Sequence, residues 1–236
     1  SMTQIRIWSK TNPTSTVARR RPPKNEIARM SVDLVWQGPV GPGCAPGAPF
    51  PDDPLLFENL CEAGVYLRVK TYEGDRTIAY AGQSVSLLSR FDQHLVAMLS
   101  LAAPLRDAAG HVVFTGDAAA RIDAYGRLEE ATALAASDAG RVRFWYALCD
   151  DYFHTEHLNL AEGLLQRRIA ARMSAAHPGG PAVVENAKAA PGAMPDDVPD
   201  VWINDFSGLD VASAKLLGDL LGAETMTLEM LTGNAA

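Results

Sequence analysis

The chain has 236 residues, of which 47% are hydrophobic and 21% charged, and its net charge is −7. This composition is typical of a globular protein and excludes a collagenous, fibrous or disordered chain. The average charge also argues against a nucleic-acid partner, because contacts to phosphates need cationic surface.

The charge is distributed unevenly along the chain. Residues 1–30 hold seven Lys or Arg and one Glu, a net +6, and we expect a basic arm over residues 1–35 that is flexible unless bound. Its cations predict contacts to DNA, with a solvated tail as the alternative; they are Arg19, Arg20, Arg21 and Lys24. Residues 191–236 form an acidic extension, which could pack on the body, mimic DNA or serve solubility alone.

The apolar spacing of residues 36–190 predicts one α+β domain. Residues 37–54 are rich in Pro and Gly and predict an irregular loop. Strict alternation predicts a half-buried strand and two partners for it, over residues 64–70, 77–82 and 141–149. Helical spacing predicts four helices, over residues 86–100, 117–136, 157–176 and 210–221. We therefore expect a small three-stranded antiparallel sheet flanked by helices, with a helical insertion at about 101–140.

Several short motifs lie on these elements in a characteristic order. Gly64-Val65-Tyr66 and Tyr80-Ala81-Gly82 fall on the first two strands, and Arg90 and His94 fall on the next helix. Asp150-Asp151 and then Glu162-Gly163-Leu164-Leu165 follow. Over roughly residues 60–190 this order resembles the GIY-YIG nuclease superfamily, and most of all its type II restriction endonuclease branch. The resemblance implies a GIY-YIG-like fold and metal-dependent hydrolysis of DNA.

The residue types at these positions suit that chemistry. Phosphodiester hydrolysis needs a base for water and cations that stabilise charge on the phosphate. Tyr66 shares a strand face with Arg68 and Lys70, and nearby cations favour the phenolate that could act as base. The resemblance gives this role to the first Tyr, assisted by a Lys; Lys70 is the candidate, with a solvated strand face as the alternative.

The helix that follows carries the phosphate contacts. Arg90 and His94 are spaced i and i+4, so they share one face of the helix. A guanidinium can grip a phosphate with two hydrogen bonds, and His94 could donate to the phosphate or relay a proton. Tyr80 would contact the phosphate or order the water.

The resemblance also implies a metal ligand and an asparagine. Glu162 would hold Mg²⁺, with Mn²⁺ as a substitute, because Mg²⁺ accepts one carboxylate with phosphate oxygens and water; Glu156 is a weaker rival. Asn186 fits the final Asn best, and the alternatives are Asn159 and Asn204. A second metal cluster around His154 and His157 is a further alternative, and two cations on the Glu162 helix predict contacts to the DNA backbone: Arg167 and Arg168.

We therefore predict a Mg²⁺-dependent restriction-type endonuclease that cuts DNA, most readily double-stranded. A less specific repair or toxin nuclease and a non-cleaving nucleic-acid-binding module are the alternatives. Cutting both strands of a palindrome requires two sites, which predicts a homodimer. Sparse cysteines without a CxxC pair, no secretory signal and no membrane span predict a cytoplasmic protein.

Overall fold

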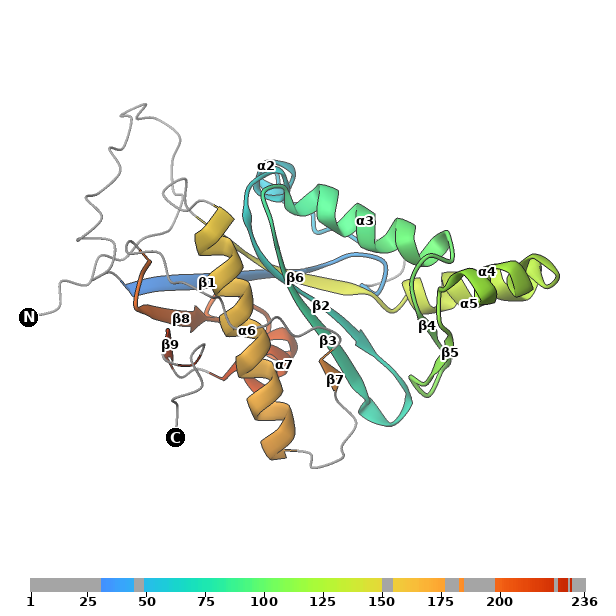
Figure 1. The fold of residues 1–236 in the computed structure, drawn as a ribbon. Helices are drawn as coiled ribbons and strands as arrows, with labels where there is room; N and C mark the ends of the chain where they lie inside the picture. The colour runs from blue at the N-terminus through green and yellow to red at the C-terminus, as the bar shows by residue number, and fades with distance from the viewer. Residues whose placement is uncertain are drawn as a thin grey trace, which may run out of the picture.

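The computed structural model describes residues 31–44, 49–149, 155–176, 183–184, 198–222, 225–228 and 230. Several predicted residues lie outside this part of the chain: the four cations of the basic arm, Asp150, Asp151, His154 and Asn186. The described residues fold around one central sheet with helices on both faces (Figure 1).

The sheet is mixed and strongly twisted. In the described residues its strand order is β7-β3-β2-β6-β1-β8-β9. Antiparallel pairing joins β3, β2, β6 and β1 in turn and joins β8 to β9, whereas β1 pairs with β8, and β3 with β7, in parallel. The strands are β1 (Ser31–Val40), β2 (Gly64–Thr71), β3 (Thr77–Ser84), β6 (Arg143–Leu148), β7 (Val183–Val184), β8 (Val201–Asp205) and β9 (Met226–Thr227).

The prediction of a small three-stranded sheet is wrong. The three predicted strands are present as β3, β2 and β6, but β1 and β8 continue the sheet beyond β6. In β1 the buried residues alternate, and Trp36 is fully buried, although the strand begins in the expected arm and ends in the expected loop. It passes through that Pro- and Gly-rich region with a register shift between Gln37 and Val40, and Gly38 adopts a φ of 112°. The Pro- and Gly-rich composition predicted a loop here. Gly and Pro also occur at irregularities within strands, so their presence did not exclude a strand.

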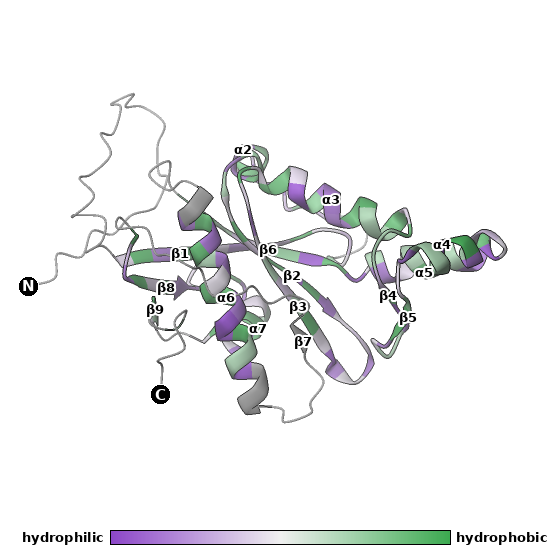
Figure 2. Ribbon diagram, viewed as in Figure 1, coloured by the Kyte–Doolittle hydropathy of each residue, from purple (hydrophilic) through white to green (hydrophobic). Residues whose placement is uncertain are grey.

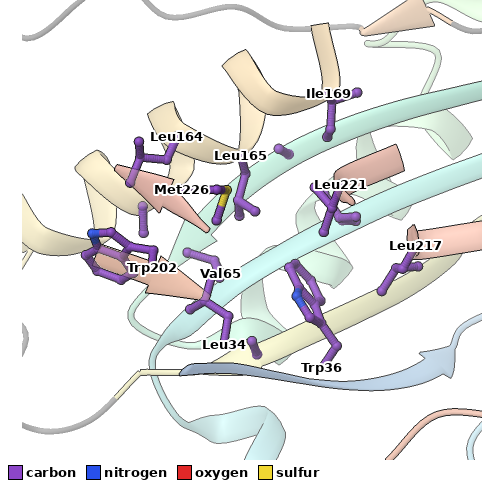
Figure 3. Packing of buried hydrophobic residues seen from close by; sticks show 14 of the residues in the cluster. Leu34, Trp36, Val65, Leu164, Leu165, Ile169, Trp202, Leu217, Leu221 and Met226 are labelled. Carbon is purple, nitrogen blue, oxygen red and sulfur yellow. The ribbon is translucent and has the colours of Figure 1, made fainter. Parts of the chain in front are cut away.

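Two hydrophobic clusters lie on the two faces of the sheet. One is covered by α6 (Thr155–Ala176) and α7 (Val211–Leu221), and Figure 3 shows its packing around Trp36, Trp202 and Leu165. The other is covered by α2 (Leu56–Cys61), α3 (Leu87–Leu99) and α5 (Leu128–Ala139). None of the helices among the described residues is long and apolar enough to cross a membrane.

Strand β2 runs through the middle of this arrangement. Because successive side chains point to opposite faces, Val65 and Leu67 contact the α6 side and Tyr66 lies on the α3 side. The strand is buried on both faces, so the expectation of a half-buried strand is wrong. The polar residues Arg68 and Lys70 are themselves buried, at 9% and 2% exposure.

The insertion consists of a hairpin and two helices that project from the sheet (Figure 2). The hairpin is formed by β4 (Leu105–Arg106) and β5 (Val112–Phe114), and α4 (Ala118–Tyr125) precedes α5. The single helix predicted over 117–136 is therefore wrong. The helix breaks at Arg127, which adopts a non-helical φ of −136° and ψ of 44°, and Ile122 and Tyr125 on α4 are 69% exposed.

Candidate functional site

The glycines of both motifs mark points where the backbone is approached closely. Strands β2 and β3 pair Tyr66 with Gly82, and the tyrosine ring lies over that glycine. A Cβ atom on Gly82 would lie 2.4 Å from both Cζ and Oη of Tyr66. A Cβ atom on Gly64 would lie 2.4 Å from the carbonyl oxygen of Ala147 on β6. Glycine is required at both positions because no other residue leaves this space.

Three polar side chains converge around the hydroxyl of Tyr66. Its Oη lies 2.5 Å from Nε2 of His94 and accepts a hydrogen bond from Nε of Arg90 at 3.3 Å. Nη1 of Arg68 lies 3.0 Å from Nδ1 of the same histidine. Arg90 and His94 are one helical turn apart on α3, which places both above β2.

Tyr80 completes the cluster from β3. Its ring stacks against that of Tyr66 at a centroid distance of 6.2 Å and meets the His94 ring edge-on at 4.9 Å. The guanidinium carbon of Arg68 lies 4.9 Å from the centre of the Tyr80 ring, and Arg90 interacts with its hydroxyl. The structure thus brings together Tyr66, Tyr80, Arg90 and His94, the four residues predicted at the phosphate.

Aromatic packing fixes the Tyr66 ring on its other sides. Phe91 of α3 contacts it edge-on at 5.4 Å, and Phe144 of β6 contacts it at 6.3 Å. These two phenylalanines stack on each other at 4.0 Å. Tyr66 itself is buried, and these ring contacts hold its hydroxyl in position.

This burial sets the protonation states of the site. Burial raises the pKa of the Tyr66 phenol, and the opposing effects of the Arg90 hydrogen bond and the neighbouring arginines are smaller. Burial, followed by the charges of Arg68 and Arg90, lowers the pKa of His94 to about 3. At neutral pH Tyr66 therefore holds its proton and His94 is neutral. The expectation that flanking cations favour the phenolate is outweighed here by burial.

Lys70 lies deeper along β2 and points to another partner. Its Nζ lies 2.9 Å from Oδ2 of Asp138 on α5. The same carboxylate accepts a hydrogen bond from Tyr72 at 2.6 Å and one from the backbone N–H of Arg106 at 3.2 Å. The structure therefore places the ammonium in a buried ion pair that joins β2 to the insertion, and places Arg68 beside the Tyr66 cluster.

Glu162 lies on α6, on the other face of the sheet from Tyr66. It is 4% exposed, and its Oε1 accepts a hydrogen bond of 3.2 Å from Nε2 of Gln166. That amide also donates to the backbone carbonyl of Ala81 at 3.3 Å. Glu162 is therefore linked to β3 through Gln166, and it lies on the α6 face of the sheet, whereas Tyr66 lies on the α3 face.

The donor set around Glu162 suits a hydrated cation and not an all-protein cage. A carboxylate oxygen is the ligand that Mg²⁺ prefers, and Mg²⁺ commonly takes one carboxylate and keeps several waters. The described residues contain no group of three His, Cys, Asp or Glu that could hold a metal ion. His157, from the alternative cluster, is fully buried in α6, and its partner His154 lies outside the described residues. Glu162 would offer a metal one carboxylate, and its role as the metal ligand stays a prediction.

The remaining predicted residues have other surroundings. Asn159 is exposed and accepts a hydrogen bond from Gln83 at 3.2 Å, whereas Asn204 is buried on β8 and bonds the indole of Trp36. Two of the predicted DNA contacts on α6 bond to backbone carbonyls near the end of the chain: Arg167 to Met230 at 3.1 Å and Arg168 to Thr225 at 2.8 Å.

Comparisons with protein families, with curated proteins and with solved structures found no match to this chain. The site therefore has to be argued from its own geometry. Gln166, which contacts Glu162, was not named from the sequence, and Arg68, which contacts His94, was named only as a cation near Tyr66. Their spacing could have indicated them, because a strand residue at i+2 and a helix residue at i+4 share a face with the residue at i.

Proposed function

We propose that the chain is a metal-dependent endonuclease that hydrolyses phosphodiester bonds in DNA in the manner of a GIY-YIG restriction enzyme. The observation that carries the proposal is the convergence of Arg90 and His94 on the hydroxyl of Tyr66. Both groups present N–H bonds, and Arg68 adds a second positive charge beside them. A buried phenol surrounded by such donors favours an anionic reactant, and a phosphate diester is a reactant of this kind.

In this proposal each side chain has a defined task. The fraction of Tyr66 that has already lost its proton to solvent removes a proton from the attacking water, and hydrogen bonds from His94 and Arg90 would hold that phenolate. Arg90 also bonds to Gln93 at 2.8 Å, which directs its guanidinium, and its positive charge stabilises the charge that develops on the phosphate. Tyr80 orients the phosphate or the water from the neighbouring strand.

The protein groups also define how the metal would be held. Glu162 would supply the carboxylate, and Gln166 would orient it through the hydrogen bond to Oε1. When bound, Mg²⁺ supplies positive charge that stabilises the transition state and lowers the pKa of a neighbouring water. Glu162 is buried beside an uncharged amide, so Glu162→Gln should keep the fold. It should abolish the metal-dependent cleavage, because the carboxylate that would hold the metal is gone.

Cleavage by the purified full chain tests the proposal. Plasmid and genomic DNA, methylated and unmethylated, would be incubated with Mg²⁺, with Mn²⁺ or with EDTA. We expect discrete fragments that depend on the metal and disappear in Arg90→Ala and Glu162→Ala. Arg121→Ala is the matched control, because Arg121 is exposed on α4, away from the site.

Other outcomes select the alternatives. A smear of fragments would favour a less specific repair or toxin nuclease. Binding of DNA without cleavage under every metal condition would favour a non-cleaving module and would refute the enzyme. A restriction-type enzyme would act in the cytoplasm, where the genome lies, and would cut a palindrome as a homodimer; light scattering of the chain with and without DNA measures that state.

A further inference from the structure

Arg68 contacts the histidine of the site from below. It follows Tyr66 by two residues on β2, so both side chains lie on the α3 face of the strand. Arg68 is 9% exposed, its Nη1 lies 3.0 Å from Nδ1 of His94, and its guanidinium lies over the ring of Tyr80. It is therefore placed beneath the reacting groups and not at the surface that would meet a phosphate first.

This contact determines which nitrogen of His94 carries the proton. A guanidinium has only N–H donors and does not lose its proton in proteins. Nδ1 must therefore accept the hydrogen bond from Arg68, and an acceptor nitrogen carries no hydrogen. A neutral imidazole has one N–H group, so that group is at Nε2, the atom that lies 2.5 Å from Oη of Tyr66.

The direction of the next hydrogen bond follows. Nε2–H of His94 donates to the oxygen of Tyr66, and Nε–H of Arg90 donates to the same oxygen. A phenolic oxygen can accept two hydrogen bonds, and both positions are filled by these donors. The hydrogen of the Tyr66 hydroxyl must therefore point to a group other than His94 or Arg90.

We propose that Arg68 is a positioning residue that holds His94 as the Nε2–H tautomer, so that His94 donates to Tyr66 and does not take its proton. This excludes the proton-relay role for His94, because a relay would need a bare Nε2 facing the phenol. The groups that face the imidazole are Arg68 and Tyr66 from β2, Tyr80 from β3 and Arg90 from its own helix. The two arginines disfavour a charged imidazole, which keeps it neutral and a single donor. The catalytic meaning of the inference rests on the proposed function, whereas the tautomer does not.

Nuclear magnetic resonance of the full chain with ¹⁵N-labelled histidine tests the tautomer directly. Long-range ¹H–¹⁵N correlations distinguish a protonated nitrogen from a bare one, and the loss of one signal set in His94→Gln assigns the residue among the five histidines. We expect Nε2–H alone in the wild type at pH 7. In Arg68→Met we expect the two tautomers to mix, and in Arg68→Lys, which keeps a donor-only cation, we expect a return toward Nε2–H. Arg143→Met is the matched control, because Arg143 lies over the ring of Trp145 at 5.2 Å in a similar way, on β6.

An Nδ1–H tautomer in the wild type, or an unchanged tautomer in folded Arg68→Met, would overturn the inference. The wild-type measurement does so even if the variant does not fold.

Cleavage assays then add the catalytic readout: Arg68→Met should lower kcat about 10- to 100-fold with little change in KM, and Arg68→Lys should recover part of that kcat. If the wild type cuts no nucleic acid but shows the Nε2–H tautomer, the proposed function fails and the positioning by Arg68 stands. If it cuts DNA and Arg68→Met keeps both tautomer and kcat, the function stands and the positioning fails.

Discussion

Replacing Gly82 with Ala tests the geometry of the site most directly. The added Cβ atom would lie 2.4 Å from Cζ and Oη of Tyr66, whereas an ordinary contact is 3.4 Å or more. The ring must therefore move by about 1 Å. It cannot move freely, because Phe91 and Phe144 pack against it and His94 bonds its hydroxyl.

That displacement sets the expected size of the effect. A misplacement of about 1 Å in a reacting group lowers the rate about 100-fold. Insertion of a methyl group into a packed core lowers the free energy of unfolding by about 1–3 kcal/mol. We therefore expect Gly82→Ala to remain folded at 25 °C but to lose about 99% of its cleavage activity, by the ratio of those rates.

The assay combines initial rates of plasmid cleavage with unfolding in urea. Gly218→Ala is the control, because nothing lies within 4 Å of a Cβ atom at this position on α7. It should keep full activity and gain up to about 1 kcal/mol, since Ala has the higher helix propensity. In a Tyr66→Ala background the cost of Gly82→Ala should vanish, because the clashing ring is gone. Full activity in Gly82→Ala, or an equal stability cost in both backgrounds, would refute the reasoning.

Three further predictions follow from the site and its supports. The raised pKa of Tyr66 places its titration above neutral pH, so kcat/KM should rise about tenfold per unit between pH 7 and 9; a flat profile would exclude Tyr66 as the base. Unfolded His94 binds a proton near its ordinary pKa of 6.5 and the folded residue only near 3, so the free energy of unfolding should fall as the pH drops from 6.5 toward 3, and less so in His94→Gln. Asp138→Ala leaves the Lys70 ammonium buried without this carboxylate and should cost about 3–5 kcal/mol in urea unfolding, whereas Asp219→Ala, which breaks an exposed pair, should cost less than about 1 kcal/mol.

The local pattern predicted much of the site because its members are close in sequence. Tyr66 and Tyr80 belong to one hairpin, and Arg90 and His94 lie on the helix that follows it. Strand alternation and helical spacing are therefore sufficient to place them on facing surfaces. The helix over residues 86–100 was predicted from its apolar spacing, and on α3 the apolar residues Leu87, Phe91 and Met98 are buried.

The long-range features could not be predicted in this way. The partner of Lys70 is Asp138, 68 residues further along the chain, and no local period relates the two. Strands β1 and β8 were missed for a similar reason, because they are distant in sequence and meet only in the folded chain. The pKa of Tyr66 also depends on the helices that cover the strand. The neighbouring cations alone predict a lowered pKa, whereas burial raises it.

The pairing of β1 with β8 has a consequence for how the molecule forms. Ser31 lies opposite Val201 and Leu34 lies opposite Asn204, so two segments separated by about 170 residues of chain form neighbouring strands of one sheet. Contacts of such long sequence separation slow folding, because the entropy of closing a large loop is lost before these contacts contribute any stability. During synthesis the hairpin that carries both tyrosines can form early, but the hydrophobic layer beneath it stays open to water until β8 has been made. Refolding should accordingly be slow and concentration-sensitive, with the exposed edge of β1 as the point where chains associate.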